Sequence, residues 1–134
     1  MSELQIEDKI METASRDGRY HSEAYRFVFD ALDFVLISLG RHQQPIGDRH
    51  VSVEQLLDGV REFALDQFGP LSRTVLEYWG IYRTEDIGEI VFNLVEAGLL
   101  NKQETDNKAD FANGFNFREA FEESYSPEIP WDHY

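Results

Sequence analysis

Apolar side chains recur at three- and four-residue steps along most of this chain, and residues 84–100 show the pattern most clearly. This spacing places the apolar side chains on one side of a helix. Thr84 is a residue type that caps helix N-termini, and Gly98 can adopt the left-handed conformation that ends a helix, which would bring Leu99 onto Leu94. We therefore predict a helix from Thr84 up to Gly98, with an apolar stripe formed by Ile87, Ile90, Val91, Leu94 and Val95.

The same periodicity predicts further helices before and after this segment. Ser22 can cap a long helix that runs to Leu39, and Ser52 forms a capping box with Gln55 at the start of the next one. Gly59, in the middle of that helix, predicts a close crossing with another helix. The expected helices span residues 4–15, 22–39, 53–68, 70–79, 84–97 and 117–124, and the fourth should point Leu71, Val75, Leu76 and Trp79 inward.

The predicted helix at residues 22–39 is apolar almost all the way around. Its main stripe is widened by Phe27, Phe29, Phe34 and Leu36. A helix of this kind lies either at the centre of a fold or in a dimer interface. We expect the centre, and a homodimer formed through this helix is the alternative.

Residues 52–100 contain three consecutive predicted helices with short connections, which is the order of a helix-turn-helix unit. A polar stretch follows, and we expect residues 99–102 and 114–115 to form the two strands of a wing. The predicted fold class is therefore mostly α with a small β-hairpin: a winged-helix-like core at about residues 52–118 with an additional N-terminal helical layer. We expect residues 1–125 to form a single helical domain and residues 126–134 an extended C-terminal tail.

Composition excludes several classes of protein. With 134 residues and 42% hydrophobic content, the chain is long enough to bury a core. It has no cysteine, which excludes disulfides, thiol catalysis and cysteine-bound zinc. The first twelve residues are acidic, unlike a signal peptide, and the longest apolar run, residues 34–37, is too short to span a bilayer. We expect a cytoplasmic protein without membrane contact.

The charge balance argues against direct binding to nucleic acid. The chain carries 12 Lys and Arg against 26 Asp and Glu, a formal net charge of −14. The predicted recognition helix, residues 85–97, has four acidic residues and no basic one, whereas phosphate contacts require cations. A winged-helix transcription regulator that binds DNA is kept as an alternative, and it would need a basic face built from Arg16, Arg19, Arg41, Arg49 and Arg73.

Candidate chemistry is sparse. His42, Asp48 and His50 lie within nine residues and are ligand types for zinc or a non-haem metal, but their spacing matches no helical ligand motif. The sequence has no nucleophile elbow, phosphate-binding glycine loop or His-Glu-x-x-His, and it indicates no cofactor. A metal-dependent enzyme is therefore only a second alternative, and the sequence favours a role without catalysis.

The remaining residues favour a protein-interaction surface on the predicted helix at residues 84–97. Phe92 lies off the main apolar stripe of its helix, close to Glu85, Glu89 and Glu96. An aromatic anchor among acids suits a basic protein partner, although Phe92 could instead pack on the long second helix. The tail offers Trp131, either as a handle for a partner or as a side chain that docks on its own domain.

Four strings carry a resemblance: His50-Val51-Ser52, Gln67-Phe68-Gly69-Pro70, Trp79-Gly80-Ile81 and the run from Asp86 to Val95. Together they resemble a small family of conserved hypothetical proteins from planctomycete and verrucomicrobial bacteria, over about residues 20–121. The resemblance implies a cytoplasmic bacterial protein and lends no catalytic or binding residues. The sequence thus predicts an acidic protein-interaction or regulatory module that does not contact nucleic acid directly.

Overall fold

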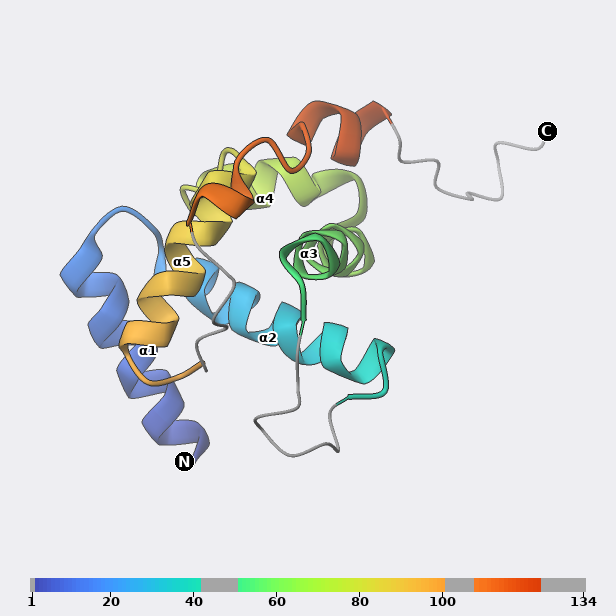
Figure 1. Ribbon diagram of the computed structural model, residues 1–134. Helices are drawn as coiled ribbons and strands as arrows, with labels where there is room; N and C mark the ends of the chain where they lie inside the picture. Colours follow the sequence, from blue (N-terminus) through green and yellow to red (C-terminus); the bar gives the residue numbers. More distant parts are fainter. Residues whose placement is uncertain (1, 42–50, 101–107, 124–134) are drawn as a thin grey trace.

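The computed structural model describes residues 2–41, 51–100 and 108–123, and these residues are mostly helical (Figure 1). No helix among them is both long and apolar enough to cross a membrane. The elements are α1 (Glu3–Asp17), α2 (Ser22–Ser38), α3 (Val53–Phe68), η2 (Gly69–Leu71), α4 (Ser72–Tyr78), α5 (Thr84–Glu96), η3 (Lys108–Phe111) and η4 (Glu119–Glu123).

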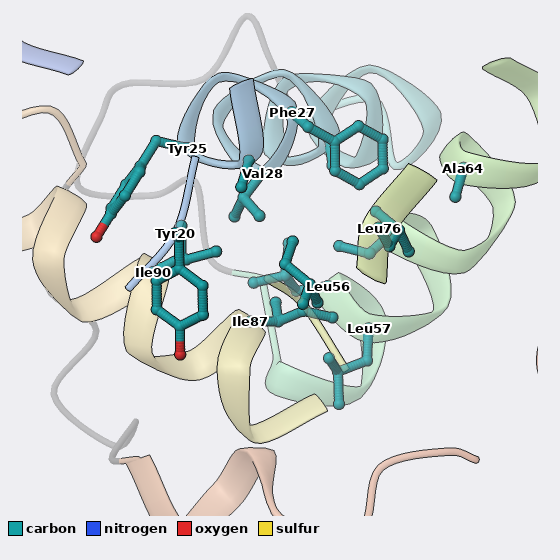
Figure 2. Close-up of a cluster of buried hydrophobic side chains, with 14 of the residues drawn as sticks. Tyr20, Tyr25, Phe27, Val28, Leu56, Leu57, Ala64, Leu76, Ile87 and Ile90 are labelled. Atoms are coloured by element: carbon teal, nitrogen blue, oxygen red, sulfur yellow. The ribbon is translucent and has the colours of Figure 1, made fainter. Parts of the chain in front are cut away.

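Helix α2 lies at the centre of the fold, as the sequence predicts. It contacts α1, α3 and α5. In Figure 1, α1 and α5 lie towards one end of α2, and α3 crosses it. Its buried side chains meet those of α3, α4 and α5 in a common core (Figure 2), which contains Tyr25, Phe27, Val28, Leu56, Leu57, Val60, Leu76, Ile87 and Ile90.

The crossing of α2 and α3 is as close as Gly59 predicts. A Cβ placed on Gly59 would lie 2.0 Å from Cγ2 of Val35 on α2. Beside this crossing, the ring of Phe27 stacks on Phe63, with 5.3 Å between centroids, and it contacts Phe68 and Trp79. The α2–α3 contact therefore combines two features: Val35 packs directly against the backbone of Gly59, and aromatic rings pack beside the crossing.

Several predicted helix ends are confirmed. Ser52 and Gln55 form the capping box of α3: the Gln55 amide donates to Ser52 Oγ, and the Ser52 amide donates to Gln55 Oε1, both at 3.0 Å. At the end of α5, Gly98 is left-handed (φ 79°) and the Leu99 amide donates to the Leu94 carbonyl at 3.0 Å. This is the Schellman arrangement expected from the sequence.

Three local predictions are wrong. His21, not Ser22, caps α2, because its Nδ1 accepts the Glu23 amide at 3.0 Å. Thr84 is the first residue of α5 and fully buried, and its hydroxyl donates to the Phe111 carbonyl at 2.6 Å and accepts from the Gly114 amide. Leu71 is 61% exposed rather than inward, because the 3₁₀ turn of η2 changes the helical phase and buries the following residue, Ser72.

The β-hairpin is not confirmed, and no strand occurs among the described residues. Leu99 and Leu100 belong to the turn that ends α5, because their amides point back to the Leu94 carbonyl. On the other side, Gly114 donates its amide to Thr84, and the preceding segment forms η3. The described end of the expected loop therefore packs on α5 as the short helix η3, while residues 101–107 lie outside the described part of the chain.

Candidate functional site

The outer side of α5 carries the four residues that the sequence singles out. Glu85, Glu89, Phe92 and Glu96 follow one another at steps of four, three and four, so they lie along one stripe of the helix. Glu96 is exposed and the other three are half-buried. Phe92 packs against the edge of the core, so its ring is accessible from outside only in part.

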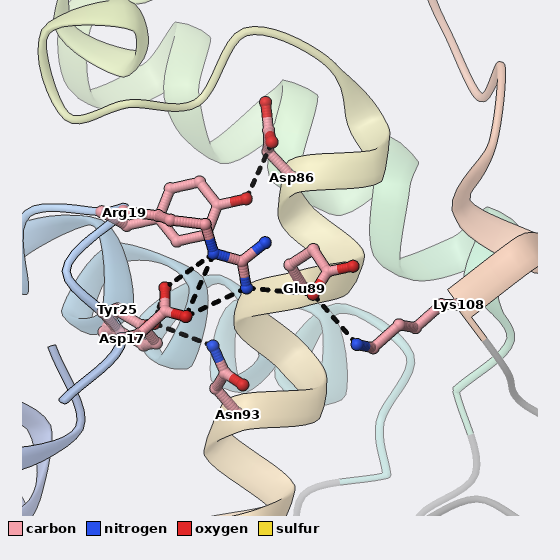
Figure 3. Close-up of polar contacts among 8 residues, drawn as sticks. Asp17, Arg19, Tyr25, Asp86, Glu89, Asn93 and Lys108 are labelled. Carbon is pink, nitrogen blue, oxygen red and sulfur yellow. Dashed lines mark hydrogen bonds and ion pairs between the residues drawn. The ribbon is translucent and has the colours of Figure 1, made fainter.

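Glu89 already binds two cations (Figure 3). Its Oε2 lies 3.1 Å from an Arg19 guanidinium nitrogen and 3.0 Å from Nζ of Lys108. The hydrogen bond from Lys108, with the one from Arg19, holds the pKa of Glu89 below its ordinary value of 4.5 against the opposing effect of burial. Glu89 thereby joins the α1–α2 turn to η3.

Behind this ion pair, a second set of polar contacts joins α1, α2 and α5. Arg19 also binds the Asp17 carboxylate, at 3.0 Å, and the Tyr25 hydroxyl donates to Asp17 at 3.2 Å. Asn93 of α5 donates to the Tyr25 hydroxyl at 2.9 Å. Burial raises the pKa of Tyr25 to about 12, although the Asn93 hydrogen bond acts in the opposite direction.

Asp17 keeps its charge in this setting. Burial alone would raise the pKa of its carboxyl group, but the hydrogen bonds from Arg19 and Tyr25 outweigh burial and lower the pKa from 3.8. A carboxylate held ionised and fully engaged by neighbours is poorly suited to proton transfer. Asp17 therefore serves to position Arg19 and Tyr25.

Asp86 takes the capping role expected of Thr84. One carboxylate oxygen accepts the Tyr82 amide at 2.9 Å and the Arg83 amide at 3.2 Å, and the other accepts the Tyr20 hydroxyl at 2.8 Å. Burial, followed by this hydrogen bond, raises the pKa of Tyr20. The start of α5 is thus tied to the start of α2.

These contacts are part of a core whose buried polar side chains are paired. Among the described residues, no buried side-chain nitrogen or oxygen lacks a hydrogen-bond partner. Nor does the described part of the chain contain a group of three or more His, Asp or Glu residues that could hold a metal ion. The predicted metal candidates His42, Asp48 and His50, and the tail residue Trp131, lie outside the described residues.

Sequence reasoning missed three exposed apolar side chains in and around α4. Leu71 is 61% exposed, Tyr78 is 80% exposed, and Tyr82, in the turn before α5, is 61% exposed. Thr74, between Leu71 and Tyr78, is exposed as well. A signal was available within α4: Arg73 and Leu76 lie on its paired and buried sides, and Thr74 and Tyr78 fall on neither.

Much of the positive charge pairs within the fold. Arg26 of α2 binds Glu3 and Glu7 of α1 and Asp30, and Arg73 of α4 binds Glu77 and Glu122. By contrast, α3 carries exposed acids at four-residue steps: Glu54, Asp58, Glu62 and Asp66. The resulting surface is strongly acidic.

No family model, curated protein or solved structure matches the chain. The resemblance to the planctomycete and verrucomicrobial family stays a prediction.

Proposed function

We propose that this protein is an interaction or regulatory module that binds a basic protein segment along the outer stripe of α5, without direct contact to nucleic acid. Phe92 is the apolar anchor of this surface, and Glu85, Glu89 and Glu96 supply its negative charge. The stripe lies on α5, which is the third of three consecutive helices (α3, α4 and α5) in the order of a helix-turn-helix unit.

The proposal rests on the two ion pairs of Glu89, which binds cationic side chains from two separate segments, Arg19 and Lys108. Glu85 and Glu96 lie on the same stripe, one turn before and two turns after Glu89. A lysine- or arginine-rich segment that binds along α5 would contact the carboxylates of Glu85 and Glu96 in the same way. Charge of this sign speeds encounter with a basic partner and repels phosphate backbones.

The test is affinity capture from native lysate with two charge-matched variants. Glu85→Lys/Glu96→Lys changes the charge of the α5 stripe and leaves Glu89 in its ion pairs. Glu54→Lys/Glu62→Lys makes the same change of charge on exposed positions of α3 and is the control. Captured proteins are identified by mass spectrometry, with and without nuclease, and folding is checked by circular dichroism.

We expect a basic protein that survives nuclease, is lost with the α5 variant and is kept by the α3 variant. Phe92→Ala should weaken the same capture. Equal loss with both charge variants would mean that net charge alone attracts the protein. Nucleic acid recovered with the bait would favour the DNA-binding regulator, and an empty capture would leave the proposal without support.

Two further predictions from the sequence have simple tests. A homodimer through α2 predicts twice the chain mass in light scattering; α2 exposes Ile37 and Leu39 near its end. The metal-dependent enzyme predicts a stoichiometric metal in elemental analysis of protein purified without a histidine tag. A monomeric mass and a metal-free sample would remove these alternatives.

A further inference from the structure

The turn that follows η3 contains Asn113 and Gly114, the one Asn-Gly pair in the sequence. Asn113 is exposed, and among the described residues it is the one residue other than glycine with a positive φ, 55°. Asparagine tolerates this left-handed backbone better than most residues, because its short polar side chain can hydrogen-bond locally. The turn therefore explains why asparagine occupies position 113.

The surroundings of Gly114 require a glycine and engage its amide. A Cβ on Gly114 would lie 2.4 Å from Cδ1 of Leu57 and 3.2 Å from Oγ1 of Thr84. The Gly114 amide donates to Oγ1 of Thr84 at 3.0 Å, and the same buried hydroxyl donates to the Phe111 carbonyl at 2.6 Å. Thr84 thus holds both ends of the turn on α5.

An Asn-Gly pair can modify itself, because glycine has no Cβ to hinder the reaction. The backbone nitrogen of Gly114, once deprotonated, attacks Cγ of Asn113, which gives a cyclic succinimide and releases ammonia. Water then breaks one of the two ring bonds to this nitrogen. If the bond to Cγ breaks, residue 113 becomes aspartate; if the bond to the main-chain carbonyl carbon breaks, it becomes isoaspartate. The net change converts an amide and water into a carboxylate and ammonia.

The fold restrains this reaction through Thr84. The Gly114 nitrogen must lose its proton and approach Cγ of Asn113, but in the structure it donates that proton to Thr84. Amides hydrogen-bonded in this way lose their protons mainly in locally opened states of the chain. The turn must therefore open before the nitrogen can attack.

Asn116, three residues later, is an internal control. It is also exposed, but Phe117 follows it, and its side chain accepts the Glu119 amide at 3.2 Å. The bulky following residue and the engaged side chain both oppose ring closure. Asn116 should therefore stay unmodified under conditions in which Asn113 reacts.

We propose that Asn113 is a site of spontaneous deamidation, that the Gly114–Thr84 hydrogen bond sets its rate, and that the isoaspartate product releases η3 from α5. Isoaspartate leads the main chain through Cβ of residue 113 and so adds a methylene group to it. Gly114 cannot then keep its close contacts with Leu57 and Thr84, and Phe111 loses the turn that holds it against Gly88.

Mass spectrometry of the full chain, incubated at mildly alkaline pH and then digested at acidic pH, follows each asparagine separately. Asn113 should convert about tenfold more slowly than in a synthetic peptide of residues 108–118, on the scale of one buried hydrogen bond. Thr84→Val, which removes the hydroxyl, should approach the peptide's rate, whereas Thr84→Ser, which keeps it, should stay near wild type. Conversion of wild type at the peptide's rate would overturn the proposal, as would no more conversion at Asn113 than at Asn116.

Amide hydrogen exchange of the wild type provides a measurement that needs no variant. The protection of the Gly114 amide should match the factor by which folding slows deamidation, since the same opening allows both. An unprotected Gly114 amide would contradict the role of Thr84.

The product is tested after separation of the isoaspartate form from aged protein by ion exchange. The Ala112 amide, which donates to the Ala109 carbonyl at 3.1 Å, and the Gly114 amide should exchange faster in this form than in wild type. Asn113→Asp adds the same charge without the methylene group and should exchange as wild type does. Unchanged exchange in the isoaspartate form would overturn the release of η3, and equally fast exchange in Asn113→Asp would assign it to charge.

Discussion

Helix α2 is attached to its neighbours by different chemistry on its two sides. Tyr25 and Phe27, two residues apart, point away from each other (Figure 2). Phe27 meets the rings of Phe63, Phe68 and Trp79, whereas the Tyr25 hydroxyl bonds to Asp17 and Asn93. We refer to these as the aromatic side and the polar side of α2.

The difference separates two sources of stability. The aromatic side depends on buried apolar area and close packing, which respond little to pH or salt. The polar side depends on ionised groups whose protonation differs between the folded and unfolded chain, so its contribution depends on pH. The polar side also holds η3 and the α1–α2 turn on α5, which makes it the part of the fold nearest to the proposed docking stripe.

The largest expected effect comes from removing the central ring of the aromatic side. Phe27→Ala should lower the free energy of unfolding by about 3–5 kcal/mol, because it leaves a cavity among Phe63, Phe68 and Trp79. Urea unfolding at pH 7 and at pH 5 measures the loss, which should be the same at both. Phe27→Leu is the control and should keep most of the stability. A loss that differs strongly with pH would contradict the comparison.

Gly59→Ala should be the next most damaging change. The added methyl would lie 2.0 Å from Val35 Cγ2, and Val35 cannot move away because its side chain is β-branched and buried. Overpacking costs about 1–3 kcal/mol and the gain in helix propensity offsets about 1 kcal/mol of it, so we expect a net loss of up to about 2 kcal/mol.

A double-mutant cycle sharpens this prediction. Val35→Ala alone should also be destabilising, but in the Gly59→Ala background it makes room for the new methyl, so the two losses should sum to more than the measured double-mutant loss. If the two losses in the free energy of unfolding, measured by urea unfolding, add up exactly, the added methyl group does not press on Val35, and the two helices have moved apart.

On the polar side, the pKa of Tyr25 is raised by burial from 10.0 to about 12. A raised folded-state pKa gives stability that is fully present below pH 10 and is lost as the pH rises from 10 to about 12. Tyr25→Phe should lower the free energy of unfolding by about 1 kcal/mol at neutral pH, since it removes two hydrogen bonds. As the pH rises, the stability of this variant should decrease less than that of the wild type. Urea unfolding from pH 8 to 11, with tyrosinate absorbance, measures both; parallel pH curves would contradict the assignment.

The smallest effect is expected at Glu89. Its pKa is lowered from 4.5, so its stabilisation is present above about pH 4.5 and is lost as the pH falls towards the folded-state value. Glu89→Gln should lower the free energy of unfolding by about 0.5 kcal/mol at neutral pH, and this difference from wild type should shrink on acidification and at high salt. Glu62→Gln, on the exposed side of α3, is the control and should change little. A difference independent of pH would mean that Glu89 stabilises by packing.

Structural features formed by residues close together in the sequence were easier to predict than contacts between residues far apart in it. The capping box at Ser52 and the end of α5 at Gly98 are predictable because neighbouring residues decide them. The close crossing at Gly59 is predictable because a glycine inside a helix marks it, but its partner Val35 is not. Most contacts between distant segments leave no local trace. The Glu89–Arg19 ion pair joins residues 70 positions apart, and nothing near Glu89 in sequence indicates it.

Packing of η3 on α5 escaped prediction for a related reason. Residues 101–112 are polar on average, which is typical of a hairpin loop, but Phe111 is almost fully buried. It fits against Gly88, where a Cβ would lie 2.7 Å from its ring. A glycine inside α5 and a lone aromatic in a polar stretch form a matching pair, and the match is visible only once both are placed. Periodicity predicts that Glu85, Glu89, Phe92 and Glu96 share one stripe of α5, as they do; the use of this stripe as a docking surface stays a prediction.

The position of α1 bears on the order in which the chain is completed during synthesis. α1 contacts α2 and α5, and Nζ of Lys9 donates to the carbonyl of Ala97, 88 residues later, at the end of α5. Because α1 is synthesised before α5, its contacts are complete only once the chain has been extended through Ala97. Contacts of such long range slow folding, and a nascent chain that ends before α5 leaves α1 with its α2 contact alone among these two.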